Sequence, residues 1–133
     1  MFFRNSKHIA HSDDAHFESE VEKLLLCRKI VKVEAKGGQV AILTLDNGVE
    51  LVAEGNEGCG GCSNGWYYLD ELNGCENAIT KVECVVEAGK YESDSVYHLY
   101  VYADNKRINC LQYSGGDNGY YGTGYNLYVK VKK

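Results

Sequence analysis

The sequence predicts a mainly β fold: an antiparallel meander or small barrel of six to seven strands, with one N-terminal amphipathic helix. Short segments of alternating apolar residues follow one another along most of the chain, as in Val96–Ala103. Hairpin signals such as Asp46-Asn47-Gly48 separate these segments. The chain has 15 glycines and no proline, so glycine makes the turns that require a positive φ.

The length of 133 residues predicts a single domain spanning 1–133, and the 44% hydrophobic content can supply a core. Residues 1–12 are polar and show no period, so we expect them to form a flexible arm. A helix is expected at 13–27 and a β domain at 28–133.

Within 13–27, Phe17, Val21 and the leucines after them recur at helical spacing. Ser12 or Asp13 is expected to cap the helix N-terminus, where several acidic residues suit the positive end of the helix dipole. We expect this amphipathic helix either to cover an opening or face of the sheet or to contact another subunit.

Alternation and turn signals predict strands at 28–35, 40–45, 49–54, 78–88, 96–103, 107–113 and 126–132. The segment 66–72 is compatible with a strand end or a short helical turn. Consecutive strands joined by tight turns predict antiparallel neighbours rather than a parallel α/β sheet.

The net charge of −5 and the pI near 5.3 argue against a nucleic-acid polymer as partner, because such binding depends on cationic contacts with phosphates. The sequence contains no apolar run long enough for a membrane span and no signal-peptide pattern after Met1. We therefore expect a cytoplasmic protein whose six cysteines are thiols rather than disulfides.

Two segments rich in glycine and aromatic residues, Gly55–Leu72 and Tyr113–Tyr125, differ from the surrounding hairpins. The first contains the only tryptophan, Trp66. Glycine allows backbone N–H groups to approach a phosphate, and aromatic faces stack on bases. We expect the two segments to face each other across a nucleotide pocket, although many tyrosines in strands serve only the fold.

Metal binding is an alternative use of the first segment. Cys59 and Cys62 have the spacing of half a zinc site, with Cys75 and Cys84 as further candidate ligands. Because a second Cys-x-x-Cys pair is lacking, we assign no metal ligand and no cofactor, and zinc remains open. A thioredoxin-type role lacks its βαβ context, and no nucleophile or acid–base spacing is present, so we do not expect an enzyme.

Several stretches together resemble a family of small phage-encoded proteins that is similar to the Thoeris anti-defence sponges. The resemblance extends over about Lys29 to Val131 and is carried by Leu45–Gly55, Ser63–Tyr67, Leu72–Ile79, Leu99–Arg107 and Asn118–Gly122. It implies a protein of the host cell cytoplasm that binds a cyclic ADP-ribose isomer, or a cyclic oligonucleotide, without cleaving it. It also implies a homo-oligomer with ligand pockets near the subunit interfaces.

The resemblance implies an aromatic stacking residue, an asparagine and an arginine in the pocket. Trp66 or Tyr121 would stack, Asn64 or Asn118 would recognise polar edges, and Arg107 would neutralise phosphate. The full set of expected ligand-binding residues is Asn64, Trp66, Tyr67, Arg107, Tyr113, Asp117, Asn118, Tyr120 and Tyr121. The alternative function is a structural or host-protein-binding phage protein without a small-molecule ligand.

Overall fold

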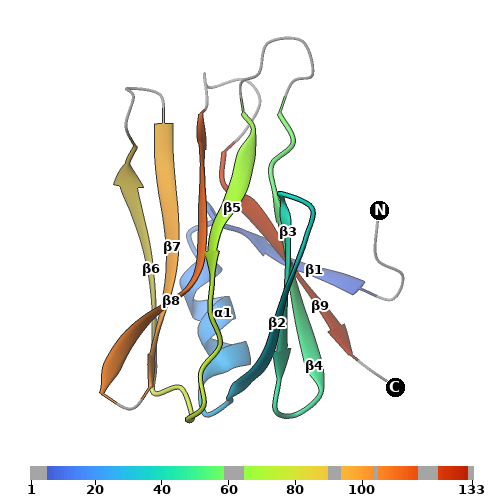
Figure 1. Ribbon diagram of the computed structural model, residues 1–133, viewed down its shortest axis with the longest axis vertical. Helices are drawn as coiled ribbons and strands as arrows, with labels where there is room; N and C mark the ends of the chain where they lie inside the picture. Colours follow the sequence, from blue (N-terminus) through green and yellow to red (C-terminus); the bar gives the residue numbers. More distant parts are fainter. Residues whose placement is uncertain (1–5, 59–64, 90–93, 104, 117–122, 132–133) are drawn as a thin grey trace.

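The computed structural model describes residues 6–58, 65–89, 94–103, 105–116 and 123–131, in which it has nine strands and one helix (Figure 1). The elements, in chain order, are β1 (Ser6–His11), α1 (Phe17–Leu25), β2 (Ile30–Lys36), β3 (Val40–Leu45), β4 (Val49–Gly55), β5 (Tyr67–Leu72), β6 (Lys81–Ala88), β7 (Asp94–Ala103), β8 (Lys106–Gly116) and β9 (Tyr125–Val131).

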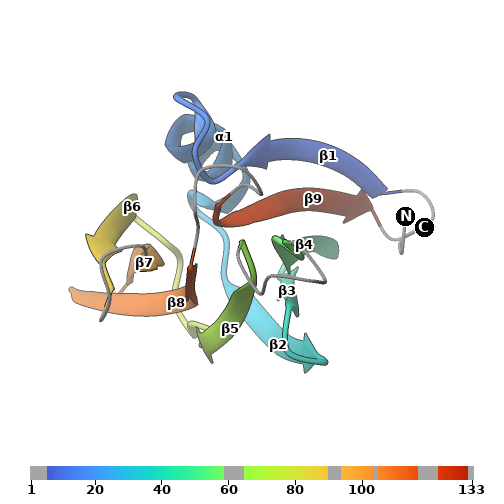
Figure 2. The same cartoon turned by 90° about the horizontal axis from the view of Figure 1, so that it is seen from above.

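The strands form two antiparallel sheets rather than one closed barrel (Figure 2). The first sheet has the order β1-β9-β4-β3-β2 and the second the order β5-β8-β7-β6. The prediction of a mainly β, antiparallel fold with one helix is confirmed. The predicted number of six to seven strands is wrong, because β1 and β5 add to the seven segments in which strands were expected.

The first of these additional strands lies in the expected N-terminal arm. β1 pairs with β9 from Ser6 opposite Lys130 to His11 opposite Asn126. Its residues are mostly polar because β1 is an edge strand, which is held by backbone hydrogen bonds and buries few side chains. Apolar alternation therefore could not reveal it.

The helix is shorter than the predicted 13–27. Its N-cap is His16, whose side chain makes no capping hydrogen bond. Ser12 and Asp13 do not cap it, because the Ser12 backbone N–H donates to the Tyr125 carbonyl at 2.9 Å and so prolongs the pairing of β1 with β9. The chain is thus still tied to the sheet where the helix was expected to begin.

The apolar face of α1 closes the gap between the two sheets along β1 and β6 (Figure 2). Phe17, Val21 and Leu25 are buried in the common core. Glu18 lies beside the edge of β6, where its carboxylate accepts the backbone N–H of Cys84 at 2.8 Å. The expectation that the helix covers an opening is therefore confirmed.

On the opposite side, β5 joins the two sheets. Its Tyr67 N–H donates to the carbonyl of Asn56 at 3.0 Å, and its Leu69 N–H donates to the carbonyl of Gly38 at 2.8 Å. This approach requires glycine in β4, since a Cβ on Gly55 would lie 2.2 Å from the Tyr67 carbonyl oxygen. β5 is consequently fixed to both sheets.

The core changes character along the strands. Aliphatic side chains fill its middle, whereas four buried tyrosines, Tyr67, Tyr97, Tyr113 and Tyr125, fill one end. Tyr113 and Tyr125 stack with ring centroids 4.7 Å apart, and Tyr97 meets Tyr67 edge to face at 5.6 Å. These aromatic pairs stabilise the end of the sandwich that carries the candidate site.

Candidate functional site

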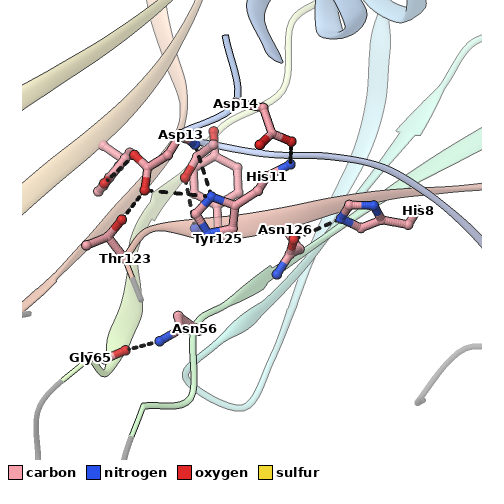
Figure 3. A network of polar contacts seen from close by, with 11 residues as sticks. His8, His11, Asp13, Asp14, Asn56, Gly65, Thr123, Tyr125 and Asn126 are labelled. Atoms are coloured by element: carbon pink, nitrogen blue, oxygen red, sulfur yellow. Dashed lines mark hydrogen bonds and ion pairs between the residues drawn. The ribbon is translucent and has the colours of Figure 1, made fainter. Parts of the chain in front are cut away.

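The two glycine-rich segments begin and end side by side. The Asn56 N–H donates to the Gly124 carbonyl at 2.9 Å, and the Gly65 N–H donates to the Gly116 carbonyl at 2.5 Å. The Asn56 side chain also donates to the Gly65 carbonyl at 2.6 Å (Figure 3). We call this end of the sandwich, where β4 passes to β5 and β8 passes to β9, the loop end.

Five of the expected ligand-binding residues lie between these anchor points and outside the described residues. They are Asn64, Asp117, Asn118, Tyr120 and Tyr121. The structure therefore brings the bases of the two segments together, and the facing of their tips stays a prediction. Cys59 and Cys62 also lie outside the described part of the chain.

Tyr67 and Tyr113 support the loop end from inside the core. Each is 0% exposed, so neither ring offers a face to a ligand. The Tyr113 hydroxyl donates to the backbone carbonyl of Gln39 at 2.7 Å and lies 3.1 Å from that of Ala53. Burial, with a smaller contribution from Glu54, raises the pKa of Tyr113 well above its ordinary value.

Trp66 has an aromatic neighbour that sequence analysis did not include. Its ring lies parallel to that of Tyr68, with 6.3 Å between centroids and 9° between the planes. Tyr68 is 49% exposed, whereas Tyr67 between the two is buried. Alternation along a strand would have placed Trp66 and Tyr68 on one face, but the segment was equally compatible with a helical turn.

Arg107 lies at the other end of β8. It pairs with Tyr102 beside the turn from β7 to β8, and its guanidinium lies 4.1 Å from the ring centroid of Tyr100. Gly115, next to the loop end, is eight residues further along the strand, which corresponds to roughly 26 Å. The structure therefore does not bring Arg107 together with Trp66 within the chain.

A polar network fastens the N-terminal segment to the loop end (Figure 3). The carboxylate of Asp13 accepts the hydroxyl of Tyr97 at 2.7 Å and also accepts the hydroxyl of Thr123. The Asp13 N–H donates to His11 Nδ1 at 3.0 Å, and the Tyr125 N–H donates to Ser12 Oγ at 3.1 Å. The end of the expected arm and the first residue of the expected helix thus hold the start of β9 in place.

The charges of the described loop end are mainly acidic. Burial and the neighbouring Glu57 carboxylate raise the pKa of Glu54 above its ordinary value. Asp13 and Asp70 add further carboxylates, while Lys36 provides an exposed cation at the end of β2. Such a surface favours hydrogen-bond donors of a ligand more than its anionic groups.

Within the described ranges, no group of three or more His, Cys, Asp or Glu side chains is arranged to hold a metal ion. Cys75 is buried, and its sulfur lies 3.4 Å from the Ile30 backbone N–H. Cys84 lies in β6 beside α1, where burial raises its pKa to about 12. Neither thiol belongs to a group that could hold a metal ion, and the zinc alternative at Cys59 and Cys62 concerns residues outside the described ranges.

A groove of about 590 Å³ lies at the end of the sandwich remote from the loop end. Val31 and Ile108 contribute apolar surface, and Glu76 and Lys106 contribute opposite charges. The lining includes none of the expected ligand-binding residues.

Over the described residues, no helix is long and apolar enough to cross a membrane.

Comparison with known families gives one match, which covers most of the chain. Residues 23–127 match the family described as "Domain of unknown function (DUF7448)". Neither curated proteins nor solved structures gave a match. The matched region includes the last turn of α1, all of β2 to β8, the start of β9 and the bases of both glycine-rich segments. The chain belongs to the DUF7448 family.

Proposed function

We propose that this protein binds and sequesters a small cyclic nucleotide signal at the loop end, without cleaving it. The observation that carries the proposal is the convergence of the bases of both glycine-rich segments beside a partly exposed aromatic pair, Trp66 and Tyr68. The ligand class, a cyclic ADP-ribose isomer or a cyclic oligonucleotide, follows from the resemblance to the Thoeris anti-defence sponges. Assembly as a homo-oligomer in the host cytoplasm belongs to the same proposal.

The chemistry of the loop end suggests how such a ligand is held. A base stacks on aromatic rings, which contributes about 1–3 kcal/mol per base. Ribose hydroxyls donate to carboxylates such as Glu57. Phosphates need donors instead, and the many glycines of 55–65 and 114–124 suit close approach by backbone N–H groups. Lys36 is the cation we assign to this end in place of Arg107.

The alternative of a protein-binding phage protein predicted an exposed apolar face on the helix. Phe17 and Val21 on that face are buried in the core, and Leu24 is partly buried against it. The helix therefore lacks the surface that would have favoured this alternative. For this reason we prefer a small-molecule ligand.

A ligand panel tests the proposal. Cyclic ADP-ribose isomers and cyclic di- and trinucleotides are added in turn, and melting temperature and native mass are measured. A ligand that binds only the folded protein raises its melting temperature, by an amount equivalent to about 2.7 kcal/mol at 100 times Kd. A flat panel would reject the proposal.

The fate of the ligand separates sequestration from catalysis. After denaturation of the complex, mass spectrometry should recover the ligand intact, and a cleaved product would indicate a phosphodiesterase instead. Trp66→Ala should abolish the thermal shift. Val31→Ala is the matched control, because it truncates an exposed apolar side chain in the remote groove.

A further inference from the structure

We propose that Trp66 and Tyr68 together bind one planar heterocycle with an amino-substituted edge, an adenine-type base, and that Tyr68 is the second stacking residue of the site. This inference rests on the proposed function at the loop end and names the moiety that the aromatic pair recognises. It also assigns a binding role to a tyrosine outside the residues expected from the sequence.

The geometry of the pair suits a flat ligand. Trp66 immediately precedes β5 and Tyr68 is its second residue, so their side chains rise from one face of the chain. Residues two apart on a strand are separated by about 6.6 Å, and the ring centroids keep nearly that spacing at 6.3 Å. Because the planes differ by only 9°, a planar ligand parallel to them can stack on one ring and border the other.

The pair is held in place before any ligand arrives. Tyr67 anchors the strand in the core, and the Leu69 N–H is bonded to the Gly38 carbonyl. Tyr68 packs over Gly38, where a Cβ would lie 3.4 Å from the tyrosine ring. On the other side, a Cβ on Gly115 would lie 1.9 Å from the Trp66 carbonyl oxygen. Such support reduces the ordering cost of binding.

The exposure of Tyr68 also points to a ligand. Within the described ranges, three large apolar side chains are exposed, and Tyr68 is the aromatic one; the others are Val31 and Val86. Its half-exposed ring borders Trp66 and lies beside the base of a glycine-rich segment. An aromatic face on a rigid strand next to such a segment is suited to stacking on a base.

The carboxylates of Glu57 and Asp70, beside the aromatic pair, influence which planar ligands bind. Glu57 lies opposite Trp66 in an isolated antiparallel bridge and is exposed. Asp70 follows Tyr68 by two residues and is also exposed, with one oxygen accepting the Gln112 amide at 3.2 Å. Carboxylates accept hydrogen bonds from amino groups and repel phosphate. The pair therefore favours an amino-substituted heterocycle over a sugar phosphate.

Intrinsic fluorescence offers a direct test, because Trp66 is the only tryptophan of the chain. The emission of the full chain is titrated with adenosine, with inosine, and with ribose 5-phosphate. We expect adenosine to quench Trp66 with saturation. Inosine, which has a carbonyl in place of the amino group, should bind several-fold more weakly, and ribose 5-phosphate should not quench.

Substitution of Tyr68 provides a second test of the proposal. Tyr68→Ala should weaken adenosine binding about 5- to 150-fold, whereas Tyr68→Phe, which keeps the ring, should retain it. Tyr68→Leu serves if the alanine variant does not fold, and Val31→Ala is the control on a remote exposed side chain. Unsaturable quenching by adenosine, or wild-type affinity in Tyr68→Leu, would overturn the proposal.

The two proposals fail in different ways. If a cyclic nucleotide raises the melting temperature but leaves Trp66 emission and the Tyr68→Ala affinity unchanged, sequestration stands and the stacking role is rejected. If adenosine quenches Trp66 with the expected Tyr68 dependence but no cyclic nucleotide shifts the melting temperature, the base site stands and sequestration is rejected. Quenching by ribose 5-phosphate equal to that by adenosine would reject recognition of the ring.

Discussion

Gly115→Ala should destabilise the fold at the point where β5 meets β8. Gly115 pairs with Tyr67, and a Cβ at this position would lie 1.9 Å from the carbonyl oxygen of Trp66 and 2.8 Å from the Tyr67 ring. Real Cβ contacts essentially never fall below 3.0 Å, so the strands must separate by about 1 Å. The obstacle is backbone, which cannot rotate away as a flexible side chain can.

The expected cost is about 3 kcal/mol, at the upper end of the usual range for overpacking. That is a substantial share of the roughly 5–15 kcal/mol by which a domain of ordinary stability is folded. The melting temperature should fall by roughly 10 °C, and the urea midpoint should fall with an unchanged m-value. Thermal and urea unfolding followed by circular dichroism would measure both changes.

Gly38→Ala is the matched control for this substitution. Its Cβ would lie 3.4 Å from the ring of Tyr68, which is ordinary van der Waals contact with a partly exposed side chain. The control should therefore stay within about 0.5 kcal/mol of the unmodified protein. A Gly115→Ala protein as stable as the Gly38→Ala protein would refute the reasoning that glycine is required for the approach of β5.

Three further predictions concern individual buried or partly buried side chains. Tyr113→Phe removes the hydroxyl that hydrogen-bonds to backbone carbonyls in the core but keeps the shape of the side chain. The free energy of unfolding in urea should fall by about 1–3 kcal/mol. An unchanged free energy of unfolding would argue against that hydrogen bond. The raised pKa of Glu54 means that its charged form is disfavoured in the fold, so its contribution to stability falls as pH rises from 4.5 towards the folded-state value. Glu54→Gln should therefore stabilise the protein at about pH 7 and flatten this part of the pH profile, and an unchanged profile would contradict it. Because burial raises the pKa of Cys84 to about 12, little of this thiol is ionised at about pH 8. It should be alkylated at least about 100-fold more slowly than the exposed Cys27 thiol. Equal labelling of both cysteines in peptide mass spectra would contradict the burial of Cys84.

Hairpins could be predicted because their signals are local. The apolar alternation of 40–45 and the Asp46-Asn47-Gly48 turn define β3 and the start of β4 within a few residues. Helix residues Phe17 and Val21 were likewise expected from their spacing and are buried. In these elements the side chains that form the pattern also form the core, so the period predicts the structure.

Where such a pattern is lacking, tertiary contacts determine whether an element forms and where it begins. β1 exists because β9 offers it a partner 115 to 124 residues along the chain, from the pairing of His11 with Asn126 to that of Ser6 with Lys130. α1 begins late because Ser12 is still bonded to Tyr125. Neither partner lies within the range of a local signal.

The candidate site shows the same division. The sequence by itself determined an antiparallel β protein with two glycine-rich aromatic segments, because strand alternation and turn chemistry act over a few residues. Only the tertiary structure placed Asn56 beside Gly124, paired Trp66 with Tyr68, and separated Arg107 from both by most of the length of β8. Strand register sets these distances, and register depends on contacts between residues far apart in the chain.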